Sequence, residues 1–275
     1  MSCNSEKQID IQGHRGCRGL FPENTLLAFE KAIELGVHTL ELDIAITKDN
    51  KVVVSHEPFM NPLICYNPKG EVIPDSMGMH YNLYQMTHEE IKTFDCGSKF
   101  HPTYNNQKKL KTYKPLLSEL FELVNAKNAD VKFNIEIKSN PEYYGIYTPQ
   151  PINYVEIVLG EIEKYGKFDK VNLQSFDLAI LQEIKKQSPK MPVALLVDED
   201  ESIEGKLNKL NYKPEIISPY YKLLSRESVK NYQSQDFQII PWTINNKLDM
   251  LQMINWQVDG IITDYPDLLL ELMKK

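Results

Sequence analysis

Short strand-like runs alternate with amphipathic helical runs along almost the whole chain, and this alternation constrains the fold more than any other feature. The strand-like runs lie at residues 9–12, 39–46 with an extension at 51–55, 131–138, 171–176, 193–197, 215–218, 238–244 and 260–263. Helical patterns lie between or after them, at 24–35, 116–126, 154–165, 178–187, 226–233, 248–255 and 267–273. About eight β/α units result, which predicts an α/β fold of the (β/α)8 TIM-barrel class.

One segment interrupts the alternation. Residues 58–115 are polar and irregular, with a turn signal at residues 67–70 and one short helix that begins with a capping-box pairing of Thr87 and Glu90. A chain of 275 residues is normal for one barrel. We therefore predict a single barrel domain over residues 1–275 that carries 58–115 as an insertion after the second strand. Its expected place is the mouth of the barrel, where active-site loops lie.

Two of the predicted central strands carry charges, although strands buried on both faces should be almost continuously apolar. Glu41 and Asp43 alternate with apolar residues in one strand, and Glu136 and Lys138 do so in another. If the apolar sets face the outer helices, the charged sets point into the barrel. Buried carboxylates must be paired or bind metal, and one ion pair with Lys138 would explain only one of the three. Oxygen ligands of this kind favour Mg²⁺, Ca²⁺ or Mn²⁺ over Zn²⁺.

Two histidines follow predicted strand ends, where they suit proton transfer. His14 ends the first strand and begins a glycine-broken loop, and His56 follows the apolar run at 52–54. Arg15, next to His14, offers a fixed planar fork for phosphate oxygens. We expect the remaining four histidines to be solvated, with the first of them at the opposite end of the barrel: His38, His80, His88 and His101.

Composition narrows the function and the compartment. The net charge of -7 argues against nucleic acid, whose binding needs a basic surface, and no apolar run is long enough to span a membrane. The four cysteines show no paired spacing, so we expect free thiols and a cytoplasmic location. A removed signal or lipoprotein leader stays an open alternative, in which Cys3 would carry the lipid.

An ordered set of short motifs resembles the glycerophosphodiester phosphodiesterase family from Gly13 to the C-terminus. Each motif is weak alone, but the ordered set is highly specific. The motifs are Gly-His-Arg-Gly at 13–16, Pro-Glu-Asn-Thr at 22–25, Glu-Leu-Asp at 41–43, Ser-His-Glu at 55–57, Asn-Ile-Glu-Ile-Lys at 134–138, Gln-Ser-Phe at 174–176, Trp-Thr-Ile-Asn at 242–245 and Asp-Gly-Ile-Ile-Thr-Asp-Tyr-Pro at 259–266.

The resemblance implies a barrel enzyme that hydrolyses small glycerophosphodiesters to sn-glycerol 3-phosphate and an alcohol. It also implies one divalent cation, Mg²⁺ or Ca²⁺, with Mn²⁺ as an alternative. By position, the residues that resemble the family's site are the metal ligands Glu41, Asp43 and Glu136, the acid–base pair His14 and His56, the phosphate contacts Arg15 and Lys138, the metal-rim residue Glu23 and the cleft residue Trp242. Glu57 follows His56 where the family usually has aspartate.

Several other functions are weighed against this one. A metal-dependent sugar isomerase or amidohydrolase could use a similar barrel, but such sites usually place metal-binding histidines on strands, which these strands lack. A catalytically weak barrel that only binds phospholipid headgroups remains open, as does a related phospholipase D-like phosphodiesterase. The alcohol half of the substrate and the oligomeric state are not predicted.

Overall fold

Parallel strands form a nearly closed barrel in the computed structural model, which describes residues 8–274. The hydrogen-bonded order is β8-β7-β6-β5-β4-β2-β1-β9, so each strand from β4 onward pairs with the next along the chain as far as β8. The strands are β1 (Asp10–Gly13), β2 (Thr39–Ile46), β4 (Lys132–Ile137), β5 (Val171–Ser175), β6 (Val193–Val197), β7 (Ile216–Pro219), β8 (Gln238–Ile239) and β9 (Gly260–Thr263). Backbone hydrogen bonds near the two end strands narrow the gap between them, from Asp259 N to Ile239 O at 2.9 Å and from Ile262 N to Pro241 O at 3.1 Å. The predicted (β/α)8 fold is confirmed.

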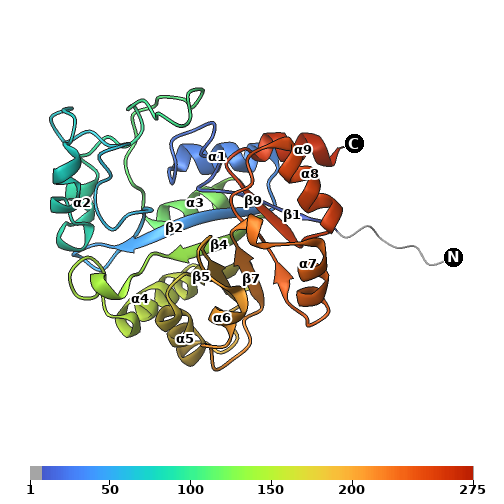
Figure 1. The fold of residues 1–275 in the computed structure, drawn as a ribbon. Coiled ribbons are helices and arrows are strands. Elements are labelled where there is room, and N and C mark those ends of the chain that lie inside the picture. Colours follow the sequence, from blue (N-terminus) through green and yellow to red (C-terminus); the bar gives the residue numbers. More distant parts are fainter. Residues whose placement is uncertain (1–7, 275) are drawn as a thin grey trace.

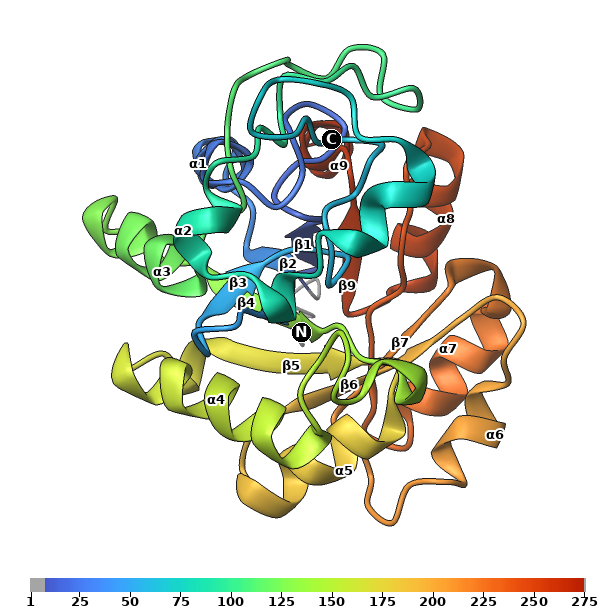
Figure 2. The same ribbon diagram turned by 90° about the vertical axis from the view of Figure 1, so that its left-hand side faces the viewer.

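Helices surround the strands on the outside, as Figure 2 shows. They are α1 (Leu26–Leu35), α3 (Leu117–Ala126), α4 (Pro151–Lys164), α5 (Leu178–Gln187), α6 (Ile203–Leu207), α7 (Arg226–Gln233), α8 (Lys247–Trp256) and α9 (Pro266–Met273). The sequence reading missed α6, because five residues are too few to show a helical period. The strand expected at 238–244 is shorter than predicted, since Pro241 has no N–H to donate to a neighbouring strand. Within residues 8–274, no helix is long and apolar enough to cross a membrane.

The expected extension of the second strand is instead a separate strand. β3 (Val52–Val54) runs antiparallel to the end of β2, with Ile44 opposite Val54. The chain reverses at Asn50, whose φ of 55° is a conformation that asparagine tolerates better than most residues. The insertion therefore leaves the barrel after β3, at the end toward which the β2 arrow points in Figure 1.

The alternation in β2 sorts its side chains between two environments. Leu40, Leu42 and Ile44 are fully buried in the large core between the strands and the outer helices. Glu41 and Asp43 face the other way, into the barrel. The parallel register places Asp43 directly beside Glu136 of β4. Strand periodicity and register together bring the predicted carboxylates to one place.

The insertion shares a small apolar core with β2 and β3, and it contacts the carboxyl end of β9 through Tyr104. It contains α2 (His88–Ile91), whose capping box of Thr87 and Glu90 forms as predicted, and the 3-10 turns η1 (Asp75–His80) and η2 (Leu83–Gln85). A second cluster of buried apolar residues lies beneath them and includes Met60, Leu83 and Phe94.

The expectation of four free thiols is wrong. Cys65 and Cys96 form a disulfide inside the insertion, with their Cα atoms 4.0 Å apart. Sequence spacing could not reveal this pair, because folding of the insertion brings together two cysteines separated by 31 positions. Cys17 is free and buried, and burial raises the pKa of its thiol to about 12. Cys3 lies outside the described residues.

Candidate active site

A pocket of about 460 Å³ opens at the carboxyl ends of the strands. In a parallel barrel this end collects the loops that follow each strand, so residues far apart in sequence meet there. The predicted residues that line it are His14, Arg15, Glu41, His56, Glu136, Lys138 and Trp242. The third predicted carboxylate, Asp43, lies next to Glu41 and Glu136.

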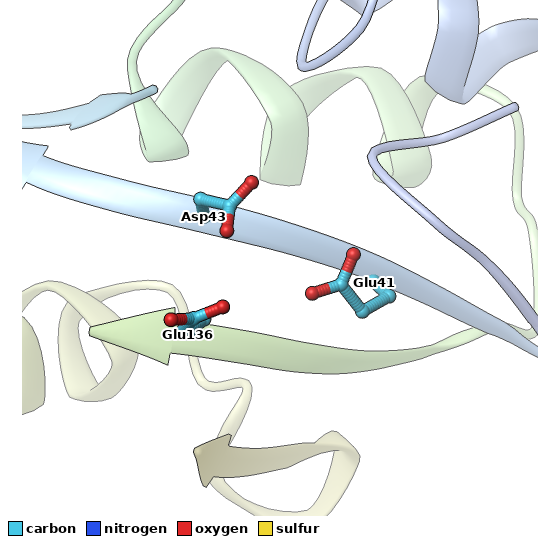
Figure 3. A group of neighbouring side chains, drawn as sticks. All are labelled: Glu41, Asp43 and Glu136. Atoms are coloured by element: carbon cyan, nitrogen blue, oxygen red, sulfur yellow. The ribbon is translucent and has the colours of Figure 1, made fainter. Parts of the chain in front are cut away.

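Glu41, Asp43 and Glu136 converge on one point. Each offers a carboxylate oxygen, and these oxygens all lie within 4.8 Å of one another, while the residues are only 2%, 0% and 7% exposed. Figure 3 shows Glu41 and Asp43 on β2 and Glu136 on the neighbouring β4. Asp43 Oδ1 is buried without a hydrogen-bond partner. An all-oxygen donor set with an unsatisfied buried oxygen fits a hard divalent cation.

The pKa shifts of these three carboxylates also fit a bound cation. Burial and the neighbours Asp43 and Glu136 raise the pKa of Glu41 well above its usual value. Burial also raises the pKa of Glu136, although Lys138 opposes the rise. Burial acts on Asp43 too, but Arg15 outweighs it and holds the pKa of Asp43 well below its usual value. Positive charge at this point would therefore favour ionisation of all the members together.

The loop after β1 holds Arg15 against the carboxylates. Arg15 adopts a φ of 50°, and its backbone N–H donates to Glu41 Oε2 at 3.0 Å. Its guanidinium lies 2.7 Å from Glu23 Oε1 and 3.2 Å from Asp43 Oδ2. Gly16 allows this course, because a Cβ there would meet the backbone of Ala28 at 2.7 Å. The predicted rim residue Glu23 thus contacts the arginine.

His14 is fixed by a carboxylate from the other end of the chain. Its Nδ1 lies 2.6 Å from Asp264 Oδ1, and its Nε2 lies 3.9 Å from Glu41 Oε2. Burial opposes ionisation of Asp264, but His14 and Arg18 hold the pKa of Asp264 far below its usual value. The carboxylate is therefore an acceptor, and Nδ1–H is the donor. Burial lowers the pKa of His14 to about 4, so the ring is neutral at pH 7 with the Nε2 lone pair toward the pocket.

His56 is fixed by its neighbour in sequence. Its Nδ1 lies 2.8 Å from Glu57 Oε1, and Lys138 Nζ lies 3.2 Å from its Nε2. Burial alone would raise the pKa of Glu57, but the hydrogen bond with His56 outweighs it and lowers that pKa. Glutamate thus contacts the histidine at the position where aspartate is usual. Lys138 also pairs with Glu136 Oε1 at 2.7 Å, so the ion pair that was weighed against a metal site exists, and it leaves the other two acids to be accounted for.

Phe176 and Trp242 form an aromatic wall in the lining of the pocket. The indole of Trp242 packs nearly perpendicular to Phe176 with ring centroids 5.6 Å apart, and its Nε1–H donates to Ser218 O at 2.9 Å. The wall is apolar and rigid, which suits it to the uncharged part of a ligand.

Sequence reasoning missed several residues that support the site. Asp264, Arg18 and Tyr104 form the network behind His14, while Asn24 and Gln174 donate to Asp43 and Glu41. Asp264 and Gln174 do belong to strand-end motifs, which was the available signal. The expectation that His88 and His101 are solvated is wrong, because the insertion buries both against the rest of the protein. His80 is exposed, and His38 lies at the amino end of β2 as expected.

Comparisons with known proteins agree with this geometry. The sequence profile of the glycerophosphoryl diester phosphodiesterase family matches residues 14–268. A Glycerophosphodiester phosphodiesterase of Caldanaerobacter subterraneus subsp. tengcongensis is 33% identical over 96% of this chain and 98% of its own length. One from Bacillus subtilis strain 168 is 28% identical over 98% of this chain and 88% of its own. A crystal structure from Silicibacter pomeroyi, assigned to the same enzymes, superposes with a TM-score of 0.87 at 26% identity, covering 97% and 94% of the two chains.

Proposed function

The chain belongs to the glycerophosphoryl diester phosphodiesterase family and is a phosphoric diester hydrolase, and from this premise we propose how it works. It hydrolyses glycerophosphodiesters to sn-glycerol 3-phosphate and an alcohol, with one divalent cation and with His14 and His56 as the acid–base pair. The whole chain acts as one barrel domain, in which residues 58–115 are an insertion that covers the mouth.

The observation that carries this proposal is the placement of two oriented histidines around one buried carboxylate cluster. Each imidazole is tied at Nδ1 to a carboxylate, and each presents Nε2 to the same pocket. Proton transfer to and from a diester needs two such groups, one for the attacking oxygen and one for the departing oxygen. No other cluster of three or more potential metal ligands occurs among residues 8–274.

The positive charges in the pocket suit a phosphodiester. Arg15 and Lys138 both line it, and each side chain also contacts Asp43. Burial alone would lower the pKa of Lys138, but Glu136 and Asp43 hold it above its usual value, so the ammonium stays charged. Glu41, Asp43 and Glu136 would hold Mg²⁺, Ca²⁺ or Mn²⁺, which when bound supplies further charge neutralisation for the phosphate.

The glycerol 2-hydroxyl is the expected attacking group, because it lies beside the phosphorus in the substrate and gains from proximity over free water. One of the two histidines takes the 2-hydroxyl proton at its Nε2, while the other gives a proton to the departing alcohol. Water then opens the five-membered cyclic phosphate with the two roles reversed. An analogue without the 2-hydroxyl should bind but barely turn over; turnover at the rate of glycerophosphocholine would instead mean direct attack by water.

The experiment that tests the function is hydrolysis of glycerophosphocholine, followed by release of sn-glycerol 3-phosphate. Thorough chelation should abolish turnover, and Ca²⁺, Mg²⁺ or Mn²⁺ should restore it better than Zn²⁺. Glu41→Gln and Asp43→Asn should lose both bound metal and turnover, whereas Glu227→Gln, an exposed acid on α7, is the matched control. Full activity in chelated protein would contradict the metal requirement, and no product at any metal concentration would contradict the activity.

A further inference from the structure

We propose that Tyr104, from the insertion, is a positioning residue for His14 and acts through Asp264. The inference rests on the proposed role of His14 as an acid–base group. It extends that proposal by making the insertion part of the proton-transfer machinery.

The phenol of Tyr104 is aimed at the carboxylate that orients His14. Its hydroxyl donates to Asp264 Oδ2 at 2.8 Å, and the residue is only 7% exposed. The ring is held independently of that bond. Arg18 Cζ lies 5.0 Å from the ring centroid, the His101 ring packs at 4.6 Å, and the Tyr265 ring at 6.3 Å. Packing thus fixes the ring, and the hydroxyl is left to serve Asp264.

The two oxygens of Asp264 have different partners. Oδ1 accepts from His14 Nδ1 at 2.6 Å and Arg18 Nε at 2.9 Å. Oδ2 accepts from Tyr104, from Asn245 Nδ2 at 2.7 Å and from Arg18 at 3.2 Å. The donors on Oδ2 therefore set the plane of the carboxylate, and that plane sets the direction along which Oδ1 holds the imidazole. Without the Tyr104 hydroxyl, the carboxylate can rotate toward its remaining donors, and Nε2 of His14 would move with it.

A second tyrosine in the insertion shows what a merely structural bond of this type looks like. The hydroxyl of Tyr113 donates to Glu119 Oε1 at 2.7 Å, near the start of α3 and outside the lining of the catalytic pocket. The two bonds have the same chemistry and nearly the same length. They differ in the role of the accepting carboxylate, because Asp264 holds His14 whereas Glu119 caps a helix.

The test is a steady-state kinetic comparison of full-length variants on glycerophosphocholine with metal present. Tyr104→Phe keeps the ring and removes the hydroxyl, so kcat should fall roughly tenfold, about the effect of one hydrogen bond to a charged group, while KM changes by less than about twofold. Tyr113→Phe should leave kcat unchanged. In an Asp264→Asn background, adding Tyr104→Phe should cost almost nothing more, because the two residues act in series.

The possible results separate this inference from the function beneath it. Three results would overturn the role of Tyr104: unchanged kcat in Tyr104→Phe, an effect on KM alone, or a full further loss of kcat in the Asp264→Asn background. The proposed function would still stand in each case if His14→Ala is inactive. Full activity in His14→Ala would overturn both. Equal losses in Tyr104→Phe and Tyr113→Phe would assign the effect to general loosening of the insertion and overturn the inference.

Discussion

The two histidines of the pocket are held in opposite ways. His14 is fixed by Asp264, which lies 250 positions away in sequence and directly follows β9. His56 is fixed by Glu57, its immediate neighbour, at the point where the chain enters the insertion. Their side chains differ in exposure as well, at 11% for His14 and 30% for His56.

The supporting carboxylates explain the difference. Asp264 is fully buried and saturated with donors from the barrel and the insertion. Glu57 accepts from His56 and from Asn61 Nδ2 at 3.1 Å, while its Oε2 is buried without a partner. The orientation of His14 is therefore set by many contacts across the fold. That of His56 depends on a short local chain of contacts and should be easier to disturb.

The largest expected loss of kcat is the same for both histidines. We propose that each histidine contributes one of the two proton transfers, so His14→Ala and His56→Ala should each lower kcat for glycerophosphocholine by roughly 10²–10⁴-fold. Steady-state kinetics with metal present checks this. If one variant keeps nearly full activity, only one of the two histidines is needed for proton transfer.

The next largest effect on kcat should differ between the carboxylate that holds His14 and the one that holds His56. Asp264→Asn disturbs both the tautomer and the direction of His14, so we expect kcat to fall roughly a hundredfold, within the acid–base contribution. Glu57→Gln should cost about tenfold or less, because Lys138 still contacts His56 Nε2. Circular dichroism of each variant controls for folding. A larger loss in Glu57→Gln would reverse the comparison.

Acid should destabilise the His14 side through linked protonation. The pKa of His14 is about 4 in the folded protein against an ordinary 6.5, so the unfolded chain binds the proton first. Folding stability is therefore lost as the pH falls from 6.5 toward 4, by at most about 3 kcal/mol from this group. Urea unfolding of wild type and His14→Gln at several pH values measures it; identical slopes in that window would refute the assignment.

Glu23 should extend the loss of folding stability in acid to lower pH. Burial would raise its pKa, but Arg15 and Arg18 lower it to about 2, so its stabilisation is complete above an ordinary pKa of 4.5 and disappears as the pH falls toward 2. Glu23→Gln should be less stable than wild type near neutral pH and should lose less on acidification. The same unfolding series tests it, and parallel curves for the two proteins would contradict it.

The smallest effect on catalysis should come from the disulfide on the His56 side. The side chain of Asn61 donates to Glu57, and the backbone carbonyl of Asn61 accepts from Cys65 N at 3.0 Å. Cys65 in turn forms the disulfide with Cys96. Replacing both cysteines by serine should lower stability by about 2–4 kcal/mol and kcat only a few-fold. Thermal unfolding and kinetics measure the two effects. Loss of kcat without loss of stability would show that the disulfide acts on the site directly.

Much of the site was predictable because strands and motifs are local. Strand periodicity placed Glu41 and Asp43 on one face, and parallel strands bring their carboxyl ends together, so the convergence with Glu136 and Lys138 followed. The family resemblance added Trp242. The insertion was least predictable, since its folding depends on contacts such as the Cys65–Cys96 disulfide that no local pattern encodes.

The sequence by itself determined the barrel, the carboxylate cluster and the presence of His14 and His56 at strand ends, because hydrophobic periodicity and residue type suffice for these. Only the tertiary structure decided what holds each histidine. Asp264 and Tyr104 reach His14 from 250 and 90 positions away through barrel closure and packing of the insertion. Direction and protonation of a buried imidazole depend on donors, acceptors and burial in space, and neighbours in space are set by the whole fold.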